Sequence, residues 1–238
     1  MNELDEFEDK LIERFRQHPV FASVEELPDE DFHAILLQRR FLSLAFTVAY
    51  DLAIDLIDDE QAVRIARVII REEYPDDGGP GRTPSHRELM TQDIRKAGVN
   101  REQIVASRPS AATVRTITAT MSLIADAGCA AQSKVELLTI LRFWGEVLVS
   151  VEYDELWRRL RHTLVEDGEN KSVFYYPHLV HDAKSRPIAA ASVLSLTHSD
   201  QLGVRLSQLL DSAPAREAFK NTEQAILDLK SGFYDQFS

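Results

Sequence analysis

Residues 133–165 read SKVELLTILRFWGEVLVSVEYDELWRRLRHTLV, and this stretch decides the fold class. Its apolar residues recur every three or four positions, a spacing that places them on one side of an α-helix. The stretch contains no proline, and Gly145 is its single glycine. It therefore predicts one long helix.

The same spacing predicts helices in much of the remaining chain. Their ranges are 3–17, 29–57, 60–74, 86–97, 109–127, 172–185, 187–197 and 200–236. Glycine and proline cluster at a few points instead of recurring at short intervals, which disfavours a β-sandwich. We expect an all-α fold, a bundle of about eight helices that forms a single domain over 1–238.

Residues 75–85, PDDGGPGRTPS, interrupt the helical pattern and predict a loop. Ser85 is a candidate N-cap for the helix that follows, because Glu88 stands three residues later, as in a capping box. Pro187 should end or kink the helix before it.

The composition narrows the function and the location. The 238 residues include 39 acidic and 27 basic side chains, a net charge of −12 that disfavours nucleic acid and anionic membranes as partners. Cys129, the single cysteine, cannot form an internal disulfide. Neither a secretory signal nor an apolar run of about 18 residues is present. We expect a cytoplasmic protein.

Two predicted helices carry an acid on their apolar side. At 100° per residue, Glu73 shares a stripe with Ala66 and Ile69, and Glu72 lies at its flank. Glu146 faces away from a predicted polar face that consists of Glu152, Glu155, Arg158, Arg159 and His162. A buried carboxylate must be paired, hydrogen-bonded, protonated or bound to a metal. A helix-end acid and a salt bridge to arginine are the simpler interpretations.

Three histidines are placed for metal binding. His86 lies on the same face as Leu89 and points inward, although a lone histidine there is more often a core or cap residue. His178, His181 and Asp182 are spaced i, i+3 and i+4, so one helix can present all three to one point. A solvated His-Asp pair is the alternative.

Nitrogen and oxygen ligands without sulfur suit iron, manganese or zinc. Carboxylates and histidines inside a helical bundle are typical of diiron and dimanganese proteins. Zinc hydrolysis stays open, although the motif His-Glu-x-x-His is absent.

These residues resemble the heme-oxygenase-like diiron oxidases and oxygenases, which include the chlamydial death-domain-associated protein. The shared features are an acid before a glycine-rich loop, a His-x-x-Leu turn, a mid-helix glutamate and a final histidine-aspartate helix. They correspond here to residues 73–79, 86–89, 145–146 and 178–182, and the resemblance covers roughly 30–236.

The resemblance implies a heme-oxygenase-like bundle that holds two irons and reacts with dioxygen. The implied ligands are Glu73, His86, Glu146, His178, His181 and Asp182. The implied reaction is oxidation of a small, possibly aromatic, amino or carboxylic acid in natural product biosynthesis, by N-oxygenation, C–C cleavage or nitrile or alkene formation. An external electron donor is needed, and a homodimer is compatible with the sequence. Residues that could wall the substrate pocket are Phe143, Trp157, Tyr175 and Tyr176.

The sequence departs from the family pattern twice. Ser185 stands where the family has its last histidine, and His181 is the expected substitute. The glutamate usual on the early long helix has no clear counterpart, although Asp51 or Asp55 could serve. The resemblance therefore assigns fewer certain ligands to the second iron than to the first.

Three other functions stay open at this stage. A metal-free binding protein would pair Glu146 with an arginine, bond His178 to backbone and lack a cavity. A thiaminase-like enzyme would use Cys129 as its nucleophile. Cofactor-independent oxidation would need a basic pocket, for which the candidates are Arg39, Arg40 and Arg142.

Overall fold

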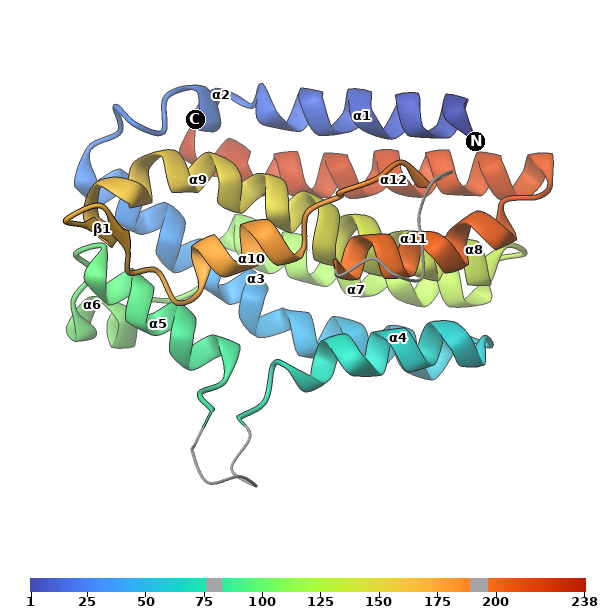
Figure 1. Ribbon diagram of the computed structural model, residues 1–238, viewed down its shortest axis with the longest axis horizontal. Helices are drawn as coiled ribbons and strands as arrows, with labels where there is room; N and C mark the ends of the chain where they lie inside the picture. The colour runs from blue at the N-terminus through green and yellow to red at the C-terminus, as the bar shows by residue number, and fades with distance from the viewer. Residues whose placement is uncertain (76–82, 189–196) are drawn as a thin grey trace.

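The computed structural model describes residues 1–75, 83–188 and 197–238, and helices dominate it (Figure 1). The longer helices are α1 (Asn2–Arg16), α3 (Asp29–Leu56), α4 (Glu60–Arg71), α5 (His86–Lys96), α7 (Ala111–Cys129), α9 (Leu148–Leu164), α11 (His198–Leu209) and α12 (Ala213–Tyr234). The shorter ones are α2 (Pro19–Ala22), α6 (Arg101–Ala106), α8 (Ser133–Thr139), α10 (Tyr175–His181) and the 3₁₀ turn η3 (Asp235–Phe237). Two-residue strands β1 (Val165–Glu166) and β2 (Glu169–Asn170) form a small hairpin. The all-α prediction is confirmed.

The long helices pack side by side around one apolar core. Helix α12 contacts α1, α7 and α8, while α3 packs against α7 and α4, and α10 lies on α9 (Figure 1). Fully buried Tyr50, Ile124, Leu156 and Ile226 bring α3, α7, α9 and α12 together. No helix in the described ranges combines the length and apolar character needed to cross a membrane.

The predicted helix over 133–165 is continuous but changes its winding. A π-helical segment, η1 (Ile140–Val147), lies between α8 and α9. Such segments are frequent at functional sites. A Cβ added at Gly145 would lie 2.9 Å from the Tyr50 hydroxyl oxygen, so glycine permits the close approach of α3 to η1. The adjacent Glu146 is 2% exposed, as its helical phase predicted.

Several predicted boundaries were wrong. The single helix expected over 200–236 is two helices, because Ser212 caps α12 and Pro214 stands in its first turn. The helix expected over 172–185 is only α10, and most of 187–197 lies outside the described residues. The capping box at Ser85 is confirmed, with Glu88 N–H donating to its hydroxyl at 3.3 Å.

Two of the five residues predicted for the polar face of α9 are buried. Glu152 and Glu155 are 0% and 7% exposed because they form ion pairs with neighbouring helices. Glu152 bonds Arg39 and Lys230, and Glu155 bonds Arg16. Helical phase cannot distinguish a solvated charge from one that a neighbouring helix neutralises.

Replacing Gly145 with alanine should destabilise the fold, because the new methyl group meets Tyr50 and Phe46 side chains at 2.9 to 3.4 Å. We expect a loss of about 1–3 kcal/mol in the free energy of unfolding, measured by urea denaturation. Gly232→Ala is the control: nothing lies within 4 Å of that added Cβ. It should stabilise α12 by roughly 0.5–1 kcal/mol. A neutral Gly145→Ala would contradict the tight contact.

Candidate metal centre

Five segments converge on one cavity. They are the ends of α4 and α10, the starts of α5 and α11, and η1. Acidic and histidine side chains from all five line it, namely Glu72, Glu73, His86, Glu146, His178, Asp182 and His198. Apolar side chains, including Phe46, Ile69 and Met90, line it as well.

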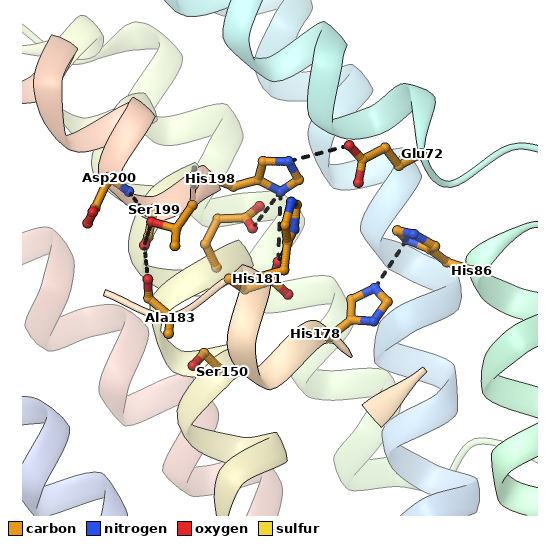
Figure 2. Close-up of polar contacts among 12 residues, drawn as sticks. Glu72, His86, Ser150, His178, His181, Ala183, His198, Ser199 and Asp200 are labelled. Atoms are coloured by element: carbon orange, nitrogen blue, oxygen red, sulfur yellow. Dashed lines mark hydrogen bonds and ion pairs between the residues drawn. The ribbon is translucent and has the colours of Figure 1, made fainter. Parts of the chain in front are cut away.

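A first cluster consists of Glu73, His86 and His178. His86 Nδ1 lies 2.9 Å from Glu73 Oε1 and 3.2 Å from His178 Nε2. Figure 2 shows the two imidazoles facing each other from α5 and α10. Three of the predicted ligands are therefore linked through His86 Nδ1, although they come from segments 13 and 92 residues apart.

The tautomer of His178 suits a metal ligand. Its Nδ1–H donates to the Phe174 carbonyl oxygen at 2.7 Å, so Nε2 carries the lone pair, which faces His86 Nδ1 at 3.2 Å. Ligating histidines commonly fix their second nitrogen in this way. Burial and the nearby His86 lower the pKa of His178 to about 3, so its imidazole is neutral.

A second cluster consists of Glu146, Asp182 and His198, of which Glu146 and Asp182 were predicted ligands. One oxygen or nitrogen atom from each lies within 4.8 Å of the others. His198 Nδ1 is 3.5 Å from Glu146 Oε2 and 3.8 Å from Asp182 Oδ1. The three side chains are 2%, 6% and 7% exposed in the same order.

The pKa values of two groups in this cluster, Asp182 and His198, are shifted by burial and by their neighbours. Burial raises the pKa of Asp182 to about 7, and Glu146 adds to that shift while His181 opposes it. Burial alone would lower the pKa of His198, but its bonds with Glu146 and Glu72 outweigh that effect and raise the pKa to about 10. The protonated His198 thus supplies a positive charge between the carboxylates of Glu146 and Asp182.

His198 also lies close to two further possible ligands, Glu72 and His181. Its Nε2 lies 3.6 Å from Glu72 Oε1, and Glu72, His181 and His198 form a third set of atoms within 4.8 Å (Figure 2). His181 contacts Asp182 Oδ1 at 3.3 Å, yet its side chain is 44% exposed. His198 is better buried than His181, which was predicted to substitute for the imidazole missing at Ser185.

Ser185 helps to hold the segment that provides His198. Its hydroxyl donates to the Asp200 carboxylate. The Ser199 hydroxyl donates to the Ala183 carbonyl oxygen at 2.9 Å, as Figure 2 shows. These bonds join the chain after α10 to the start of α11.

Tyr50 supports Glu146 from the apolar side. Its hydroxyl donates to Glu146 Oε1, and burial and that carboxylate raise the pKa of Tyr50 well above its usual value. Such bonds orient a ligating carboxylate.

The donor atoms of both clusters are of the types that bind iron, and those of the second cluster all lie within 4.8 Å of one another. Glu73, His86 and His178 offer one carboxylate and two imidazoles, and Glu146, Asp182 and His198 offer two carboxylates and one imidazole. Oxygen and nitrogen donors of this kind suit non-heme iron. The fit also explains why acids lie in an otherwise apolar wall.

Other predicted residues lie away from this cavity, or have a different role. Phe143, Trp157, Tyr175 and Tyr176 are outside the lining that the described residues form. Trp157 instead packs on Tyr176, with ring centroids 5.2 Å apart. Asp51, Asp55 and Cys129 are exposed, and none of them lines the cavity.

Of the three predicted basic candidates, Arg39 lines the cavity. Arg142 is 1% exposed and pairs with buried Glu8, while its Nε donates to the Ser199 carbonyl at 3.1 Å. Arg142 thus ties α1 and η1 to the start of α11. Arg40 lies over the Phe41 ring.

His198 was not predicted from the sequence, and Glu72 was placed only at the flank of the apolar stripe. His198 fell between two predicted helices. The available signal was Thr197, whose hydroxyl caps Asp200 and thereby starts α11 at His198.

Asp93 holds α10 in place without touching the clusters. It is 0% exposed, and its carboxylate accepts from the backbone N–H groups of Val173, Phe174 and Tyr175 at 2.9 to 3.1 Å. This bonding satisfies the unpaired N–H groups at the start of the helix that carries His178.

Asp93→Ala should therefore weaken both the fold and metal binding. Buried N–H groups lose their acceptor, which we expect to cost about 2–4 kcal/mol in urea unfolding. Iron affinity should fall although no ligand is removed. Asp58→Ala, at a fully exposed side chain, is the control and should change neither quantity. Unchanged iron binding in Asp93→Ala would show that α10 does not need this cap.

No family model matches the chain, and no curated protein matches it either. Solved structures do. One, a domain of unknown function with a heme oxygenase-like fold from Shewanella denitrificans, has a TM-score of 0.70 at 15% identity over 99% of this chain and 90% of its own. A CADD-like protein of unknown function from Nostoc punctiforme has a TM-score of 0.66 at 13% identity, covering 100% and 97%. A TenA family transcription regulator from a Silicibacter species scores 0.60 at 15% identity, covering 99% and 95%. The chain has the heme oxygenase-like fold that its motifs predicted.

Proposed function

We propose that the protein is a non-heme diiron oxygenase that oxidises a small amino or carboxylic acid with dioxygen. The observation that carries the proposal is the buried group Glu146, Asp182 and His198 directly beside Glu73, His86 and His178. These two carboxylates and the imidazole are all under 8% exposed, and a metal ion could balance the carboxylates in place of the protons at His198 and Asp182.

When bound, the two irons would reduce dioxygen with electrons from an external donor. Several residues of the chain orient the side chains that would hold the irons. The bond from His178 Nδ1–H to Phe174 leaves the lone pair of His178 on Nε2, the nitrogen that faces His86. Tyr50 bonds and orients the carboxylate of Glu146, which would help to hold the second iron. Apolar side chains in the wall limit water near the clusters.

The metal-free alternative has less support. Glu146 pairs with Tyr50 and His198 instead of an arginine, and a cavity is present. The backbone bond of His178 is the one expected mark that the structure has, and ligating histidines make it too. The thiaminase-like reading is disfavoured because Cys129 is exposed and outside the cavity lining.

Anaerobic titration of the metal-free protein with Fe²⁺ tests the proposal. Wild type should bind about two irons per chain, as this type of bundle does. His178→Ala and His198→Ala should each weaken one site at least tenfold, and the double variant Glu146→Ala with His178→Ala should bind none tightly. Oxygen uptake by the reduced protein should follow the same order.

His162→Ala is the matched control, since that imidazole is 60% exposed and lies outside the cavity lining. It should bind iron like wild type. The proposal fails if wild type binds no more iron than the double variant.

A further inference from the structure

A group of positive side chains lines the same cavity. Arg39 on α3 and Lys230 on α12 are 3% and 1% exposed. Arg39 Nε donates to Glu152 at 2.8 Å, and Lys230 Nζ donates to both oxygens of Glu152 at 3.0 and 3.1 Å. Two buried cations therefore share one carboxylate.

The group has one positive charge in excess. Among the described residues, Glu152 is the one carboxylate within ion-pair distance of either cation. Burial lowers the pKa of Lys230 to about 8, with Glu152 opposing the shift and Arg39 adding to it. Most of the ammonium is still protonated at neutral pH. An uncompensated buried charge is costly, so one further anion would complete the group.

Hydrogen-bond donors are left over at the same place. Arg39 uses Nε for Glu152 and Nη1 for Ser43, and its Nη2 has no partner in the described part of the chain. The indole N–H of Trp144 is buried without an acceptor, although Trp144 lines the cavity and lies under Lys230 at 5.5 Å. Native proteins rarely leave such a donor unpaired.

Aromatic rings connect this group to the metal centre. Phe46 stacks on Trp144 and on Tyr50, at centroid distances of 6.0 and 4.3 Å, and Tyr50 bonds Glu146. On the other wall, Tyr153 contacts Arg39 at 5.1 Å and His178 at 6.2 Å. A molecule with an apolar body could reach from the cations to the clusters along these rings.

We propose that Arg39, Lys230 and Trp144 bind the carboxylate of the substrate, whose apolar or aromatic body then lies along Phe46. A single negative charge matches the excess of one positive charge, which favours a monocarboxylate over a phosphate dianion. That this ligand is the substrate rests on the proposed function. The anion subsite itself does not depend on iron.

Isothermal titration of the metal-free protein tests the subsite with 4-phenylbutyrate and its neutral analogue 4-phenylbutanamide. Wild type should bind the acid at least tenfold more tightly than the amide, because charge-assisted bonds are lost with the charge. Inorganic phosphate should not compete. Lys230→Met should remove the preference for the acid while amide and iron binding stay unchanged. Lys220→Met, at a surface pair with Glu3, is the control and should behave like wild type.

Equal affinity for acid and amide in wild type would overturn the inference, as would a preference that survives Lys230→Met, or phosphate binding as tight as the acid. Lys230→Met leaves Arg39 and Glu152 as a balanced pair, so it should fold. If it does not, Glu152→Gln decides, because removing the competing carboxylate should strengthen acid binding, and unchanged or weaker binding would overturn the subsite. If the protein prefers the acid but binds no iron, the result contradicts the proposed function and supports the anion subsite.

Discussion

The repulsion between two buried carboxylates, Glu146 and Asp182, is the constraint on which this structure depends. Like charges in a low-dielectric interior cannot both ionise without a counter-charge. Here the partial remedy is a protonated His198, together with the raised pKa of Asp182, which is about 7. A metal ion would replace those protons and relieve the repulsion. The fold has kept an arrangement that would be unfavourable in a purely structural core.

Much of the surrounding architecture serves to hold these groups in place. The π-helical segment η1 and Gly145 let Tyr50 reach Glu146. Asp93 fixes the start of α10, and Arg142 ties the start of α11 to α1. Tyr50 bonds the cluster residue Glu146 directly, whereas Asp93 and Arg142 act on the ligand-bearing segments. Asp93 and Arg142 are themselves buried charged residues, and their hydrogen bonds and ion pairs fix the positions of these segments.

Helical phase predicted that Glu146 faces the protein interior and that His178 and Asp182 share one face of a helix. Glu146 was recognisable because its neighbours at helical spacing are apolar, and the spacing of His178 and Asp182 placed both on one turn. His198 was not, because its contacts with Glu72, Glu146 and Asp182 depend on how other segments pack against the start of α11 and not on its own periodicity. Glu152 and Glu155 were assigned to solvent for the same reason: their partners Arg39 and Arg16 come from distant segments.

The most direct test of the account is anomalous diffraction at the iron edge from crystals grown without metal and loaded with Fe²⁺ under anaerobic conditions. Two peaks should appear in the cavity, one coordinated by Glu73, His86 and His178, the other by Glu146, Asp182 and His198. A single peak, a peak outside this cavity, or a His198 ring turned away from the second iron would contradict the account.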